Sequence, residues 1–91
     1  MHDWTLVSVT FDWAMGSVAI SLLDCTSAAQ TVHARGVRRL CLDRQEPWGA
    51  SVSVLSHEGP AEGGQGIRRL VIRMQSGDEI QIEARSFEMP E

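Results

Sequence analysis

Side chains suited to recognition gather in one short turn near the middle of the chain. Arg44, Glu46 and Trp48 lie in a segment that Pro47 and Gly49 keep out of regular structure. Because Trp and Arg are enriched at binding hot spots, this turn is a candidate contact surface for a partner. Arg44 and Glu46 can instead bind a polar ligand or pair with each other at the surface. Trp48 can instead cover the open end of a small barrel, which we favour because a small core needs large side chains.

The other candidate binding residues are Trp4 and His57. Trp4 precedes the first expected strand and can face either the core or a partner. His57, like His2 and His33, has no partner at a metal-ligand spacing such as H-x-x-x-H. We therefore expect surface histidines, no metal and no cofactor.

The sequence carries no catalytic signature. All eight basic residues are arginine, which excludes Schiff-base chemistry and a P-loop lysine. An enzyme that uses Asp12, Glu46 or His57 as acid–base groups needs two of them within hydrogen-bond reach in a cleft. An enzyme is therefore the least favoured of the functional hypotheses.

Strands must position these residues, because apolar and polar residues alternate along much of the chain. The clearest example is 67–84, where two alternating runs meet at a turn over 75–79. The parity of the runs predicts a three- or five-residue loop centred on Gly77. In the expected register Ile72 faces Ile82.

Charged residues on the strands are expected to help fix the register of pairing. Arg73 is expected to lie diagonal to both Glu79 and Glu83. Arg38 and Arg39 are adjacent, and adjacent strand residues point to opposite faces. We therefore expect no basic patch from this pair.

The first hairpin is expected to comprise a strand over 5–13, a turn over 14–17 and a second strand. Pairing of its apolar faces sets Phe11 opposite Ile20. The apolar face of the first strand then carries Val7, Val9, Phe11 and Trp13, so Trp13 is expected in the core.

The middle of the chain is less regular. A weaker strand over 30–34 meets a break or bulge at 35–36. The apolar run over 37–43 predicts a central strand covered on both faces. A further strand over 50–56 precedes 57–66, where four glycines and one proline in ten residues predict a mobile loop.

Six or seven short strands without a helical period indicate an all-β fold. We predict a single domain over 1–91, built as an antiparallel β-sandwich or flattened barrel. Meander hairpins are expected at both ends, over 5–23 and 67–84.

The composition limits the partners. The net charge of −4 argues against nucleic acid. No apolar stretch approaches the roughly 18 residues that cross a membrane, and no secretory signal is visible. Cys25 and Cys41 lie outside any C-x-x-C spacing and are expected to be thiols in a reducing cytoplasm.

Several short motifs occur in a characteristic order: H-D at 2–3, F-D-W at 11–13, P-W-G-A-S at 47–51 and M-Q-S-G-D-E-I at 74–80. Together they resemble a set of small uncharacterised bacterial all-β proteins with a P-W-G-x-S turn and a Q-S-G-D hairpin. The resemblance implies an all-β domain in a bacterial cytoplasm and no established activity. Some small domains of this kind are grouped with immunity proteins that neutralise toxins.

The leading functional hypothesis is a binding module that acts through contact with an unknown protein partner, as an inhibitor, an immunity-type protein or an assembly partner. The alternative is a small-ligand-binding β-barrel with its mouth at Trp48 and 57–66. A homodimer through a sheet edge is a further option, because an open sheet has edges that must be paired, covered or charged.

Overall fold

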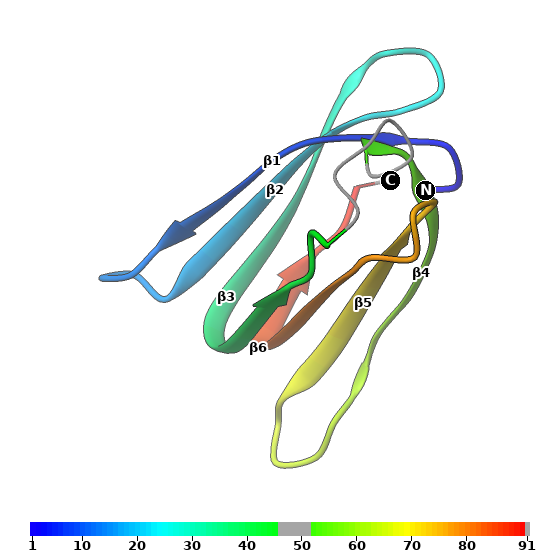
Figure 1. The fold of residues 1–91 in the computed structure, drawn as a ribbon. Helices are drawn as coiled ribbons and strands as arrows, with labels where there is room; N and C mark the ends of the chain where they lie inside the picture. The colour runs from blue at the N-terminus through cyan, green and yellow to red at the C-terminus, as the bar shows by residue number, and fades with distance from the viewer. Residues whose placement is uncertain (46–51, 91) are drawn as a thin grey trace.

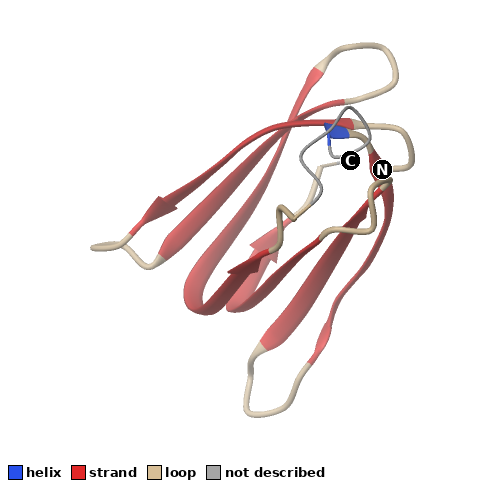
Figure 2. Cartoon of the chain, in the orientation of Figure 1, coloured by secondary structure: helices blue, strands red, loops and turns tan. Residues whose placement is uncertain are grey.

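The structure is a computed structural model that describes residues 1–45 and 52–90. Their strands form one antiparallel sheet in the order β1-β2-β3-β6-β5-β4 (Figure 1). Strands dominate the described residues, and the short helical piece drawn blue in Figure 2, which includes Val52, is of the 3-10 type and not an α-helix. The sheet is not closed, so the molecule is a single-domain flattened sandwich or open barrel, which confirms the predicted fold class. The six strands are β1 (Thr5–Asp12), β2 (Ser17–Leu23), β3 (Ala29–Leu42), β4 (Val54–Glu62), β5 (Arg68–Met74) and β6 (Glu79–Glu88).

Strand β3 bends and thereby belongs to both halves of the sheet. Its first half pairs with β2, and this pairing ends at Arg35. Its second half pairs with β6 as far as Leu42. Gly36 at the bend has a φ of 66°, and the register with β6 shifts between Val37 and Arg39. The predicted irregularity at 35–36 is confirmed, but it bends one strand where two were expected.

One apolar cluster fills the space that the curled sheet encloses. Alternate residues of the inner strands point into it, as the two-residue period predicts. On β5 even the outward-facing Val71 is buried, at 8% exposure. The buried cluster consists of Val18, Ile20, Leu22, Val32, Ala34, Val54, Leu70, Ile72, Met74, Ile80, Ile82 and Ala84.

The long hairpin has the expected faces but a different register. Ile72 pairs with Ile80 and not with Ile82, so the strands are offset by two residues from the prediction. The loop is the three residues between Met74 and Asp78, because the Met74 N–H donates to the Asp78 carbonyl oxygen over 2.8 Å. A slip of two residues leaves every side chain on its own face, so periodicity could not detect it.

The first hairpin differs from the prediction for a related reason. A register shift between Leu6 and Ser8 displaces Val7, and Phe11 pairs with Val18 and not with Ile20. Trp13 lies in the four-residue turn after β1 and is 86% exposed, so its assignment to the core is wrong.

The glycine-rich segment 57–66 was predicted to be a loop, but β4 extends through residue 62. Gly59 has a φ of 89°, and a Cβ at this position would overlap the Arg69 carbonyl oxygen of β5. The register with β5 shifts between Glu58 and Ala61. The glycine therefore allows a bulged strand to approach its neighbour, which is why composition alone gave a wrong assignment here.

The ends of the sheet meet at one corner. Thr5 of β1 forms an isolated antiparallel bridge with Ser53. The Val54 N–H donates to the Trp4 carbonyl oxygen, and the Asp3 N–H donates to the Val54 carbonyl oxygen, both over 2.8 Å. The first and last strands of the sheet are thus joined near the start of β1.

The bend predicts different costs for alanine at two glycines. Gly16 has a φ of 61° and open space around the position of a Cβ. We therefore expect Gly16→Ala to lower the free energy of unfolding by about 1–2 kcal/mol through backbone strain alone. Gly36→Ala has a similar φ, but its Cβ would lie 3.0 Å from the Arg85 side chain. We expect a further loss of about 1 kcal/mol. Urea denaturation of both variants tests this, and equal losses would contradict a tight bend.

Candidate functional site

The sheet is open between the end of β1 and the second half of β3. A cleft of about 480 Å³ lies there, which we call the β1–β3 cleft. The Val37 N–H donates to the Gly16 carbonyl oxygen over 2.8 Å, which ties the tip of the first hairpin to β3 at the bend. The cleft is lined by Phe11, Trp13, Gly16, Val37, Arg38, Arg39 and Leu40.

The wall formed by the first hairpin is apolar and unusually exposed. Trp13 and its neighbour Met15 are 86% and 75% exposed. Phe11 and Trp13 are in contact, with ring centroids 5.8 Å apart and planes tilted by 37°. Two adjacent aromatic rings at the surface are unusual in a chain with a small core, because such side chains are normally buried there.

The opposite wall carries two positive charges. Arg38 and Arg39 both border the cleft because the register shift at this point breaks the alternation of faces. The prediction that they lie apart is therefore wrong. Arg39 lies 3.8 Å from the Glu83 carboxylate, and its Nε donates to Cys41 Sγ over 3.4 Å. This thiol, and then the Glu83 carboxylate, raises the pKa of Arg39, which stays charged.

The same wall exposes backbone groups. The Asp43 N–H donates to the Glu79 carbonyl oxygen of β6 over 2.9 Å. Because backbone groups alternate in direction along an antiparallel strand, those of Leu40 and Leu42 point away from β6. Strand β2 begins at Ser17, opposite Arg35, and beyond the hydrogen bond from Val37 to Gly16 no strand in the described residues pairs with β3 on that side. The predicted central strand over 37–43 is therefore an open edge here.

A second cleft, of about 350 Å³, lies farther along the same two strands. Arg44 lines it, together with Val7 and Leu42. At its base Asp78 is only 6% exposed and accepts a hydrogen bond from the Gln45 N–H over 3.1 Å. Of the predicted site residues that the structure describes, only Arg44 lines either of these clefts.

The other predicted site residues lie elsewhere. Trp4 is partly buried and packs against the core cluster, so its ring contributes to the core. His57 is exposed on the edge strand β4, where it pairs with Ile72 and lines neither cleft. Glu46 and Trp48 lie outside the described residues. The sequence analysis missed Phe11 and Trp13 as surface residues.

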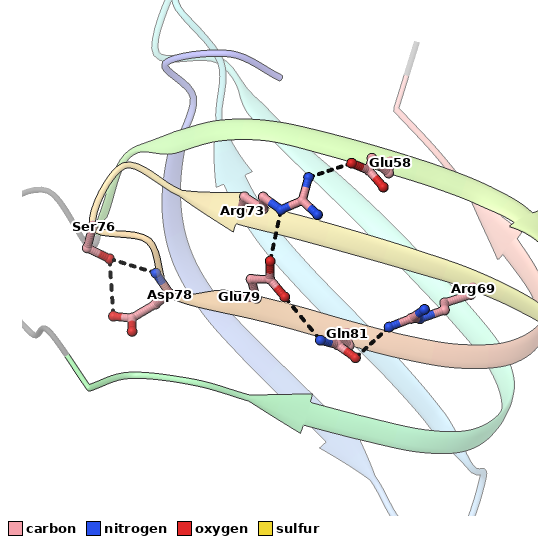
Figure 3. A network of polar contacts seen from close by, with 7 residues as sticks. All are labelled: Glu58, Arg69, Arg73, Ser76, Asp78, Glu79 and Gln81. Carbon is pink, nitrogen blue, oxygen red and sulfur yellow. Dashed lines mark hydrogen bonds and ion pairs between the residues drawn. The ribbon is translucent and has the colours of Figure 1, made fainter.

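A polar network covers the outer face of β4, β5 and β6 (Figure 3). The Arg73 guanidinium donates to the Glu58 carboxylate and, over 2.8 Å, to Glu79 Oε2. Glu79 also accepts from Gln81, whose side-chain oxygen accepts from Arg69 over 2.8 Å. These hydrogen bonds, that from Arg73 foremost, lower the pKa of Glu79. A carboxylate held ionised in this way is unsuited to donating a proton, and its hydrogen bonds link the strands β4, β5 and β6.

Comparison with known proteins finds no matching family model, curated protein or solved structure. The resemblance to small bacterial proteins therefore stays a prediction. In the described residues, no helix has the length and apolar character of a membrane span, and no group of three or more His, Cys, Asp or Glu side chains is placed to hold a metal ion.

The network predicts a pH-dependent contribution to stability. A carboxylate whose pKa is lower in the folded state stabilises the fold above its unfolded pKa and loses that effect as pH falls through the folded pKa. We expect Arg73→Gln to be less stable than the parent at pH 7. Its deficit should shrink as pH falls from the pKa of an unfolded glutamate, about 4.3, through the lower folded-state pKa of Glu79.

Urea midpoints measured between pH 3 and pH 7 test this expectation. The matched control is Arg68→Gln, on the same strand, because Arg68 is exposed and forms no ion pair with another described residue. A deficit of Arg73→Gln that is constant with pH would show that Glu79 does not depend on this partner.

Proposed function

We propose that this chain is a small binding module that acts through protein–protein contact at the β1–β3 cleft. The observation that carries the proposal is the pairing of an exposed aromatic wall with a charged wall across one cleft. Trp, Phe and Arg are the residue types enriched at protein interfaces. The cleft lies beside the bend, on strands that the core holds in place, so it is formed before a partner arrives.

The proposed class of activity is that of an inhibitor, an immunity-type protein or an assembly partner. Such proteins act by covering a surface of another protein, and their function needs no reacting group. The proposal includes a bacterial cytoplasmic location, which the motif resemblance and the two free thiols support. It also takes the chain not to be an enzyme.

A small-ligand binder is the second candidate. Both clefts fall within the range of about 300–1,000 Å³ that is typical of small-molecule sites. Protein contact is favoured because Trp13 and Met15 project from the rim, where a small ligand would leave them exposed. Thermal-shift screening with apolar and anionic compounds tests this alternative, which requires stabilisation that depends on Leu42 or Arg44.

Trp13 is the residue whose removal best tests protein contact. Because Trp13 is 86% exposed, we expect Trp13→Ser to change the free energy of unfolding by less than about 0.5 kcal/mol. Loss of a hot-spot aromatic should weaken partner binding by at least about 30-fold, which corresponds to about 2 kcal/mol. Affinity capture from a native-host extract, followed by titration calorimetry with the captured protein, measures this.

The matched control is Leu55→Ser, which also removes an exposed apolar side chain but on β4. It should bind the partner like the parent. A photo-crosslinking residue in place of Met15 should label the same protein that the parent captures. If Trp13→Ser captures its partner with parental affinity, the cleft is not the contact surface.

A further inference from the structure

Resting on the proposed function, we propose that the partner enters the β1–β3 cleft as an extended acidic segment and adds a strand to β3 along Leu40 and Leu42. This assigns the chemistry of the partner: an alternating apolar and acidic peptide recognised partly through its backbone. Three features of the cleft carry the inference: an open strand edge, apolar side chains on its inner side and two arginines beside it.

The open edge supplies the backbone contacts. Leu40 and Leu42 direct their N–H and C=O groups away from β6. On that side the pairing of β3 with β2 has already ended at Arg35. An extended peptide that runs antiparallel to 38–42 can form a ladder with both residues. About five peptide residues, roughly 17 Å of extended chain, span this stretch.

The inner side of the cleft selects apolar side chains. Leu40 pairs with the fully buried Ile82, so its side chain lies on the core face. Phe11 pairs with the buried Val18 and lies on the same face from the opposite wall. Alternate residues of an added strand would point between these two side chains and would bury apolar surface there.

The arginines select acidic residues for the remaining positions. Arg38 forms no ion pair with another described residue. Arg39 has one ion-pair partner among them, the Glu83 carboxylate, at the long distance of 3.8 Å. The chain has a net charge of −4, which would repel an acidic partner at long range. Screening limits that repulsion to about 8 Å at physiological salt, so the two nearby arginines decide the preference.

A second copy of this chain is a poorer occupant than an acidic peptide. The outer edge of β4 carries Gly59 and the cis-bonded Pro60, whose nitrogen has no hydrogen to donate. The outer edge of β1 lies beside the cleft and already contributes Phe11 to it. Neither edge has alternating acidic and apolar residues.

The probe is an acetylated nine-residue peptide of alternating valine and glutamate. One comparison peptide has lysine in place of glutamate, and another carries backbone N-methyl groups on alternate residues. We expect the glutamate peptide to bind and to slow hydrogen exchange of the Leu40 and Leu42 amides, as measured by NMR. The lysine and N-methylated peptides should bind at least ten-fold more weakly.

Charge reversal provides the matched variants. Arg38→Glu should weaken binding of the glutamate peptide at least ten-fold and strengthen binding of the lysine peptide. Arg68→Glu on β5 should change the affinity for neither peptide. Equal binding of the N-methylated peptide would overturn strand addition. Equal binding of the lysine peptide, or no effect of Arg38→Glu, would overturn the acidic preference.

The remaining outcomes separate this inference from the proposed function. If no peptide binds while Trp13→Ser still abolishes capture of the partner, the partner presents a folded surface and only strand addition fails. If Trp13→Ser leaves capture intact, protein contact at the cleft fails as well. Concentration-dependent self-association in sedimentation that Trp13→Ser removes would make the occupant a second copy and overturn the peptide assignment.

Discussion

The bend of β3 at Gly36 is the constraint on which the arrangement of the sheet depends. If β3 were straight, the strands paired with its two halves would lie in one open sheet with an exposed apolar face. The bend turns the second half of the strand, with β6, β5 and β4, over the first half. It thereby encloses the core, and it lies at the point where pairing with β2 stops, because β2 begins at Ser17 opposite Arg35.

The enclosure of the core and the opening of the cleft are therefore two results of one backbone feature. At one corner the bridge between Thr5 and Ser53 joins the first and last strands. On the other side β1 and β3 diverge, because the bend directs β3 away while β1 remains paired with β2. The apolar side chains along this divergence lie partly in the core and partly at the surface, as Phe11 does.

Periodicity predicted the all-β class, both terminal hairpins and most of the inward-facing residues, since burial of one face requires alternation. It could not predict register, because a slip of two residues changes no face: Ile72 meets Ile80 and not Ile82. It also failed wherever a bulge interrupts alternation. The register shift between Val37 and Arg39 places Arg38 beside the same cleft as Arg39. The register shift at Val7 changes the pairing partner of Phe11, farther along the same strand.

Composition was a poorer guide than periodicity in the middle of the chain. Four glycines in 57–66 indicated a loop, yet Gly59 serves close approach between β4 and β5. No residue that lines the β1–β3 cleft was predicted as a site residue, and Arg44 lines only the second cleft. The aromatic residues of the β1–β3 cleft were missed because they alternate as core residues do. No local pattern distinguishes a ring that points into a core from one at the open margin of the same core.

The irregular outer strand β4 has a consequence for pairing between copies of this chain. Sheets polymerise into fibrils when each unit offers an acceptor edge at one end and a donor edge at the other. The bulge between Glu58 and Ala61 and the missing N–H of Pro60 interrupt the row of backbone groups with which another strand would pair along β4. Continuous pairing of a second copy along the whole of β4 is therefore disfavoured, which protects one of the two terminal strands of the sheet.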